Sequence, residues 1–135
     1  MGDTVTSAQR SENMKRIRSA NTRPELTIRR MIYRLGYRYR IHVKKLPGTP
    51  DIVFSSKRKI IFVHGCFWHF HQNCRAGRIP NSKVTYWHPK LMRTRARDEA
   101  HLEKLASLGW KVLVIWECEL KDTSEVELKI QKFLE

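Results

Sequence analysis

The feature that most constrains the fold is a set of three short apolar runs in an otherwise polar and charged chain. The runs DIVF at residues 51–54 and IIFV at residues 60–63 flank the polar turn SSKRK, a pattern that predicts two adjacent strands joined as a hairpin. The third run, WKVLVIW at residues 110–116, is typical of a buried strand. A helical segment before it implies a crossover connection. The class is therefore α/β, and we expect the last strand to be buried.

The segment before the hairpin predicts a helix and then a strand. Thr22 and Glu25 form a capping box, Pro24 lies in the first turn and Gly36 supplies the stop, as at ordinary helix ends. The apolar stripe of this helix consists of Ile28, Met31, Ile32 and Leu35. From Tyr37 the period changes to two, which predicts a half-buried strand. Its alternating residues are Tyr37, Tyr39, Ile41 and Val43 against Arg38, Arg40, His42 and Lys44.

Two more helices are expected after the hairpin. One begins near Pro89 and ends at Gly109, with an apolar side formed by Leu102, Leu105 and Leu108. The other begins at a capping box of Ser124 and Glu127, and its apolar residues are Val126, Ile130, Phe133 and Leu134. Residues 1–21 are polar and basic and lack a sustained helical stripe. We therefore expect a flexible arm over residues 1–21 and a single domain over residues 22–135.

The chain has a large excess of positive charge. It carries 27 Lys and Arg against 13 Asp and Glu in 135 residues, a net charge of +14, and a polyanion would offset the resulting self-repulsion. Nucleic acid is the expected partner. An anionic membrane surface is the competing explanation, but it requires a basic amphipathic helix or a lipid signal. With no transmembrane stretch and no secretion signal in the sequence, we expect a soluble protein inside the cell.

A candidate catalytic site lies where the two strands of the hairpin meet. Asp51 follows Pro50 at the mouth of one strand, and the partner strand delivers His64 to the adjoining end. A carboxylate there can bind a hard cation, and a histidine near its ordinary pKa can take a proton from a nucleophile. Phosphodiester hydrolysis needs this combination. The alternative is that Asp51 only caps a turn and His64 is an ordinary polar residue near the core.

The cysteines predict a second metal site. Cys66 and Cys74 lie within one loop, and Cys118 follows the last apolar run. Three thiolates and one imidazole suit tetrahedral zinc. The ion would hold in place a loop that is too polar to form an apolar core of its own. The imidazole could come from His69 or His71. The alternative is a Cys66–Cys74 disulfide with Cys118 buried in the core.

Adjacent aromatic residues in the same loop indicate contact with DNA. Phe67 and Trp68 cannot both turn into the core, because the residues beside them are candidates for the metal sites. At least one of the two should therefore be exposed. Exposed apolar wedges insert between base steps, more easily where a mispair has weakened stacking. Candidates for phosphate contacts are Arg10, Lys15, Arg16, Arg18, Arg93, Arg95 and Arg97.

Four segments together resemble the bacterial very short patch repair (Vsr) endonucleases: NMKRIRS, LPGTPDIVF, HGCFWH at residues 64–69, and LGWKVLVIWECEL. The resemblance implies a restriction-endonuclease-like fold, in which a mixed sheet lies between helices. It also implies hydrolysis of one DNA strand 5′ to the mispaired T of a T·G mismatch. In most restriction-type nucleases a second acid and a lysine follow the aspartate on the next strand. Here Phe62, Val63 and His64 occupy that place, as they do in the Vsr pattern.

The resemblance also implies roles for individual residues. Asp51 and the backbone carbonyl of Val63 would hold the catalytic Mg²⁺, expected as two ions. His69 would be the general base, with His64 beside it on the water and phosphate network. Glu25 would support the metal through water, although its capping role alone would also explain it. Zinc would take His71 with Cys66, Cys74 and Cys118.

For DNA recognition, the resemblance implies that Phe67, Trp68 and Trp87 intercalate beside the mismatch, while Met14 inserts from the other groove. Ordinary packing on the long helix is the other explanation for Trp87, and Trp110 and Trp116 are assigned to the core. Lys90 would help to read the mispair. Thr94 stands where the family pattern has Asn, which leaves the preferred mispair and its flanking sequence open.

We therefore predict a mismatch-directed nicking enzyme that acts as a monomer in the bacterial cytoplasm, with mismatch-repair proteins as possible partners. The first alternative is a nuclease of the same fold that prefers another mispair or DNA structure. The second is a zinc-stapled DNA-binding module without activity.

Overall fold

The computed structural model describes residues 21–71, 74, 77–79 and 81–135. The arm expected over residues 1–21, with Met14 in it, falls almost wholly outside this part. The elements in chain order are α2 (Arg23–Arg34), β1 (Arg40–Ile41), β2 (Ile52–Phe54), β3 (Lys59–His64), α3 (Val84–Ser107), β4 (Lys111–Trp116) and α4 (Thr123–Leu134). Short 3₁₀ helices, η2 (Asn81–Lys83) and η3 (Glu117–Lys121), precede α3 and α4. None of the helices in the described ranges is long and apolar enough to cross a membrane.

The sheet is mixed and has four strands in the order β1-β2-β3-β4. The predicted hairpin is confirmed, because β2 and β3 pair antiparallel with Ile52 opposite Ile61. The crossover through α3 is also confirmed, since it brings β4 alongside β3 in parallel, with His64 opposite Trp116. The class is α/β, as predicted.

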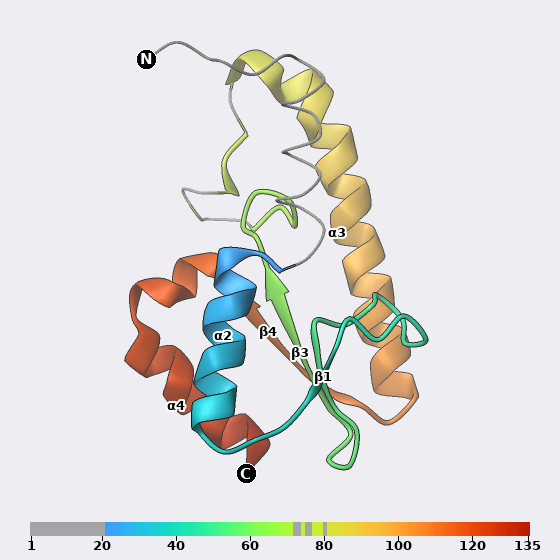
Figure 1. Ribbon diagram of the computed structural model, residues 1–135. Helices are drawn as coiled ribbons and strands as arrows, with labels where there is room; N and C mark the ends of the chain where they lie inside the picture. Colours follow the sequence, from blue (N-terminus) through green and yellow to red (C-terminus); the bar gives the residue numbers. More distant parts are fainter. Residues whose placement is uncertain (1–20, 72–73, 75–76, 80) are drawn as a thin grey trace.

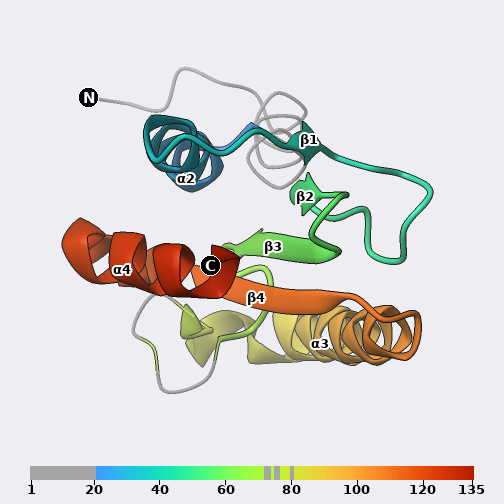
Figure 2. The ribbon, with the colours of Figure 1, turned by 90° about the horizontal axis from the view of Figure 1, so that it is seen from below.

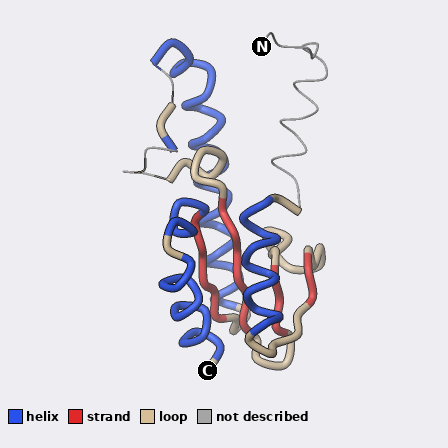
Figure 3. The backbone as a smooth tube through the Cα atoms, turned by 60° about the vertical axis from the view of Figure 1, so that its left-hand side comes forward, coloured by secondary structure: helices blue, strands red, loops and turns tan. Residues whose placement is uncertain are grey.

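Helices cover both faces of this sheet (Figures 2 and 3). On one face α2 and α4 pack on a core that includes Ile28, Ile61 and Ile130, each fully buried. On the other face α3 contributes Leu105 to a smaller core with Val53 and Ile60. The N-terminal part of α3 extends beyond the end of the sheet and runs past the loop that follows β3 (Figure 1). Helices therefore lie on both sides of the sheet where β3 and β4 end.

Helix α2 forms where its end signals predict. The Thr22 hydroxyl accepts a hydrogen bond from the Glu25 amide at 3.4 Å, and Gly36 adopts a left-handed φ of 97° just after the helix, which glycine does at little cost. Ile28, Met31 and Ile32 are buried as the apolar stripe predicts. Only half of the capping box is present, because the Glu25 carboxylate contacts His42 and Arg29 instead.

The prediction of a strand over residues 37–44 is wrong in length, because the strand in the structure is shorter. The alternation holds for Tyr37 and Tyr39, which pack on the core, but the ladder with β2 comprises only Arg40 and Ile41. His42 then takes a left-handed φ of 47°, which ends the extended backbone. The side chain of His42 consequently leaves the polar outer row and turns toward α2.

Two expectations for the long helix are also wrong. Helix α3 begins at Val84, with Pro89 inside it, because a proline removes one backbone donor without forbidding helix on either side. Leu108 is 49% exposed, whereas Leu105 is fully buried. The helix ends at Ser107, so Leu108 lies beyond the face that packs on the sheet.

The last strand and helix need similar corrections. Within the described part of the chain β4 is an edge strand, and Ile115 is its one fully buried residue. Trp116 is partly exposed and lies against His71, outside the core assigned to it. Helix α4 is capped by Asp122, whose carboxylate accepts from the Glu125 amide at 3.2 Å. The capping box predicted at Ser124 is therefore wrong, and a single cap bond forms two residues earlier in the chain.

Candidate functional site

An open cavity of about 990 Å³ lies at the end of the sheet, between α2 and α3. The start of β2 and the end of β3 share this edge because the two strands are antiparallel. Side chains that were predicted separately to be functional line the cavity together with several that were not. They are Glu25, His42, Asp51, Val63, His64, Phe67, Trp68, His69, Asp98, His101 and Glu117.

Asp51 lies at the mouth of β2, as predicted, and faces the end of β3. The amide of Val63 donates to Asp51 Oδ2 at 2.8 Å, which leaves the second carboxylate oxygen available. Burial, together with the neighbouring Glu25 carboxylate, raises the pKa of Asp51 to about 7 against the opposing effect of the Val63 hydrogen bond. A buried carboxyl group beside another one is a site that favours a cation.

Glu25 is more than a helix cap. Its side chain is 3% exposed, and its Oε2 accepts from His42 Nε2 at 2.7 Å and forms an ion pair with Arg29 Nη2 at 3.3 Å. Glu25, His42 and Asp51 each offer one ligand atom, and these three atoms lie within 4.8 Å of one another. The group can therefore hold a divalent ion.

His64 and His69 stack face to face with ring centroids 3.8 Å apart. His64 is 5% exposed, and burial together with the adjacent His69 lowers its pKa to about 3. The ring is therefore neutral at physiological pH, and its Nδ1 is buried without a hydrogen-bond partner. His64 can donate to or accept from a phosphate or a water, but it is a weak base.

His69 has a partner that the sequence did not reveal. Its Nδ1 donates to Asp98 Oδ2 at 2.6 Å, across 29 residues of sequence. With the proton on Nδ1, the Nε2 lone pair is free to accept a proton. Asp98 lies on α3 within the basic segment RTRARDEA, where it reads as one more helix surface charge.

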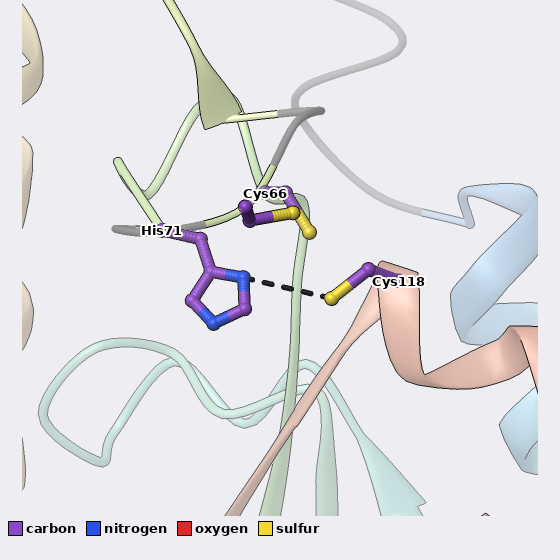
Figure 4. A group of neighbouring side chains, drawn as sticks. Cys66, His71 and Cys118 are labelled. Atoms are coloured by element: carbon purple, nitrogen blue, oxygen red, sulfur yellow. Dashed lines mark hydrogen bonds between the residues drawn. The ribbon is translucent and has the colours of Figure 1, made fainter.

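The four residues predicted to bind zinc lie close together. Cys66, His71, Cys74 and Cys118 offer ligand atoms within 4.8 Å of one another, and Figure 4 shows three of these side chains directed at a common point. Cys66 and Cys118 converge because each follows, by two residues, a member of the His64–Trp116 pair at the end of β3 and β4. Of the two candidate imidazoles, the structure brings His71 to the cysteines and His69 to Asp98.

The geometry of this cluster fits zinc. Tetrahedral zinc, with Zn–S of about 2.3 Å and Zn–N of about 2.0–2.1 Å, sets a sulfur and a nitrogen ligand about 3.6 Å apart. The distance from Cys118 Sγ to His71 Nδ1 is 3.6 Å. No disulfide joins the cysteines at positions 66, 74 and 118, which argues against the Cys66–Cys74 disulfide. Burial raises the pKa of Cys66 to about 12 and that of Cys118 as well, so the thiolates that bind zinc need the ion itself to form.

Three aromatic residues form a cluster at the mouth of the cavity. The rings of Phe67 and Trp68 meet edge to face at 5.2 Å, and Trp87 on α3 lies 5.1 Å from the first and 5.6 Å from the second. All three are only partly buried. Trp87 thus packs against the other two wedge candidates, and its position fits both explanations offered for it.

Lys90 and Thr94 occupy one face of α3 beside this cluster. Lys90 Nζ lies 4.4 Å above the centre of the exposed Tyr86 ring and donates to the Tyr86 hydroxyl at 3.2 Å. The Thr94 hydroxyl donates to the Lys90 carbonyl at 3.2 Å. The donor of Thr94 is therefore occupied by the helix backbone.

Comparison with known proteins agrees with these features. A family model described as "DNA mismatch endonuclease Vsr" matches residues 2–75. The chain is 47% identical over 135 residues to the "Type II nicking enzyme V.XorIIP" of Xanthomonas oryzae pv. oryzae (strain KACC10331 / KXO85), covering 100% of this chain and 98% of that one. It is 36% identical over 121 residues to the "DNA mismatch endonuclease Vsr" of Escherichia coli (strain K12), covering 90% and 77%.

A solved structure is similar over the same region. The "Homing Endonuclease I-Bth0305I Catalytic Domain" superposes with a TM-score of 0.56 at 25% sequence identity, covering 84% of this chain and 94% of that one. This likeness extends to a nuclease domain of another kind and supports the α/β architecture described above.

Proposed function

Because the chain belongs to the Vsr family of DNA mismatch endonucleases, we propose that it nicks one strand of duplex DNA 5′ to the mispaired T of a T·G mismatch. The products would be 3′-hydroxyl and 5′-phosphate ends that start very short patch repair. The observation that carries this proposal is one cavity that holds Asp51, Glu25 and the His64–His69 pair beside an aromatic wedge. The sheet covered by helices on both faces supports a restriction-endonuclease-like fold.

The metal chemistry is assigned to the carboxylate end of the cavity. Asp51 and the carbonyl of Val63 would bind Mg²⁺, with Glu25 close enough to assist. The ion supplies polarisation of the phosphoryl oxygen and a lowered pKa for the attacking water. Carboxylate and carbonyl oxygens are the ligands that Mg²⁺ prefers, and the pairing of Asp51 with Glu25 supports this assignment.

The proton transfer is assigned to the histidine end. Asp98 fixes the tautomer of His69 so that Nε2 faces the cavity without a proton, ready to take one from water. His64 remains neutral and supplies a hydrogen bond to water or phosphate. The stacking of the two rings supports separate roles for the two histidines, because a positive charge on His64 would oppose protonation of His69.

Mismatch recognition is assigned to Phe67, Trp68 and Trp87, which would enter the duplex at the weakened step. Met14 lies outside the described residues and keeps its proposed role in the other groove. Lys90, held near the wedge by Tyr86, would contact the mispaired bases. We propose that the chain acts as a monomer on DNA in the bacterial cytoplasm, with mismatch-repair proteins as its partners.

A substrate panel tests this function. We expect purified protein with Mg²⁺ to nick a T·G duplex on the T strand and to leave the matched T·A duplex intact, because insertion of the wedge is easiest where pairing is already weak. Nicks are measured on end-labelled duplexes by denaturing electrophoresis, with all mismatches compared and with Mg²⁺ omitted as a control. Equal cutting of matched and T·G duplexes would contradict the mismatch part.

A different mispair or flanking sequence is the second candidate specificity. The Thr94 hydroxyl already donates to the helix backbone, so it offers less to a base edge than the amide of the Asn in the family pattern. The same panel decides between the two, because the second candidate predicts efficient nicking of a mismatched duplex other than T·G.

The role of Asp98 gives a separate prediction. An Asn at position 98 can donate to His69 Nδ1 and so favours the tautomer whose Nε2 carries the proton and cannot accept another. We expect Asp98→Asn to lower kcat by about 10²–10⁴-fold, the contribution of a positioned general base, with KM for DNA unchanged. The measurement is steady-state nicking over a range of DNA concentrations.

The matched control is Asp122→Asn, the same chemical change at the cap of α4, where Asn caps as well as Asp. Its kcat should equal that of the wild type. If Asp98→Asn instead keeps full kcat, or changes KM alone, then His69 does not depend on Asp98 for its protonation state.

A further inference from the structure

His42 has two unusual features that the mechanism above does not use. Its φ of 47° lies in the left-handed region, which a residue with a side chain rarely adopts and which occurs preferentially at functional sites. Its side chain reaches across the cavity to the buried Glu25, with Nε2 2.7 Å from Oε2. Extended backbone would have pointed this ring outward with Arg38 and Arg40.

The same residue also contacts the backbone of the other acidic residue, Asp51. The amide of His42 donates to the Asp51 carbonyl at 3.3 Å, just before β2 begins. His42 therefore fixes the backbone at Asp51 and the side chain of Glu25 together. Within the part of the chain that the structure describes, His42 alone hydrogen-bonds to both of these acidic residues.

The hydrogen bonds determine which carboxylate oxygens remain available. Glu25 Oε2 accepts from His42 and forms an ion pair with Arg29, so Oε1 is left for the cavity. Asp51 Oδ2 accepts from Val63, so Oδ1 is left in the same way. The two carboxyl groups offer ligand atoms within 4.8 Å of each other, and a divalent ion between them would offset the repulsion of their charges.

We propose that His42 is a positioning residue for the metal site, which holds Glu25 in the orientation that lets its free oxygen join Asp51 around one divalent cation. This inference rests on the proposed function, and it gives Glu25 a direct part in binding the ion. Arg29 alone would not fix Glu25 equally well, because its contact is longer, at 3.3 Å, and comes from the same helix. His42 approaches from the opposite wall, so the carboxylate is held between two elements.

Metal binding tests this role directly. Mn²⁺ binding to the full chain is measured by electron paramagnetic resonance, without DNA, for the wild type and for His42→Ala, His42→Gln, Glu25→Ala and the double variant His42→Ala/Glu25→Ala. We expect His42→Ala to weaken Mn²⁺ binding by about 10–100-fold, as removal of a residue that orients a metal ligand does. His42→Gln should restore most of the affinity, because its amide can donate to Glu25.

The double variant shows whether His42 acts through Glu25. We expect His42→Ala to have no added effect when Glu25 is already Ala. As a matched control, His88→Ala removes an exposed histidine on α3 and should bind Mn²⁺ as the wild type does. Circular dichroism at the binding temperature checks that each variant is folded.

Three outcomes would overturn the inference: unchanged affinity in His42→Ala, an equal loss in His42→Gln, or a full additional loss in the double variant. A different result separates the proposed function from this inference. If the wild type and Asp51→Asn bind Mn²⁺ equally, the metal site proposed for catalysis is wrong. If Asp51→Asn loses the ion and His42→Ala keeps it, that site stands and the role of His42 fails.

Discussion

Replacing Asp51 by Asn is expected to reduce nicking by at least about 10³-fold, since the metal contributes several kcal/mol to stabilisation of the transition state. The amide keeps the shape of the side chain and can still accept from the Val63 amide, but it lacks the charge that attracts a divalent ion. Affinity for duplex DNA should persist, because the phosphate and wedge contacts lie elsewhere. Single-turnover nicking and fluorescence anisotropy of labelled T·G duplex measure the two properties separately.

The same substitution should stabilise the metal-free protein. Asp51 is buried beside the Glu25 carboxylate, which disfavours its ionised form and raises its pKa to about 7. A raised pKa means that ionisation of Asp51 opposes folding increasingly as the pH rises from 3.8 toward 7, and Asn has no charge to bury. We expect a higher Tm for Asp51→Asn at pH 8 without Mg²⁺, with little difference at pH 4.

Retained nicking in Asp51→Asn would exclude the proposed metal site. Loss of DNA binding together with activity would show that the side chain acts in binding. A wild type that binds DNA without nicking it, with Asp51→Asn binding equally well, would favour a DNA-binding module without catalysis. A gain in stability with a loss of activity is expected of a residue kept for its chemistry. It would separate Asp51 from a turn cap, whose removal destabilises.

Local patterns predicted the fold where the physical cause is itself local. The hairpin of β2 and β3 follows from two apolar runs around a polar turn, and the end of α2 at Gly36 follows from the freedom of glycine at positive φ. The first turn of α3 was missed because Pro89 reads as a start, although helix precedes it. The exposure of β4 was missed because an apolar run does not reveal how many neighbours the strand will have.

The site residues at the strand ends were predictable from the sequence, whereas Asp98 and His42 were not. Asp51, His64 and the cysteines are placed by the hairpin and by the parallel pairing of β3 with β4, both of which the sequence indicates. Asp98 and His42 reach the cavity through contacts that span 29 and 17 residues. Each lies in a run of charged or polar residues that periodicity assigns to solvent, so only the packing of α2 and α3 against the sheet reveals them.

The geometry of the sheet explains why both metal clusters lie at one end. The antiparallel β2 brings Asp51 to the tip of β3, and the parallel β4 brings Cys118 to the same edge. The loop after β3 then carries residues of both sites in alternation. Cys66 and His71 belong to the candidate zinc cluster, and between them lie the wedge residues Phe67 and Trp68 and the cavity residue His69. An ion bound by Cys66 and His71 therefore fixes the position of His69 and of both wedge residues.

Removing zinc is accordingly expected to abolish nicking and to lower stability strongly. Structural zinc contributes about 10–16 kcal/mol of apparent binding energy in small peptides, far more than single side-chain contacts, and the loop has few apolar residues to replace it. We expect one zinc per chain by elemental analysis. We also expect Cys118→Ser to lose the ion and to melt at least about 10 °C lower, a shift that a few kcal/mol causes in a chain of this size.

Zinc restored to a chelated sample should return both Tm and nicking once Mg²⁺ is also present, whereas Mg²⁺ alone should return neither. A reducing agent should change nothing, because zinc-bound thiolates, and not a disulfide, would hold the loop. Protein that contains no zinc yet melts and nicks normally would contradict this account, and so would a Tm that falls on reduction. The expected dependence on zinc follows from the chain order itself: His69, the proposed general base, lies between Cys66 and His71, two of the proposed zinc ligands. An ion that His69 does not bind would thus set its place opposite Asp98.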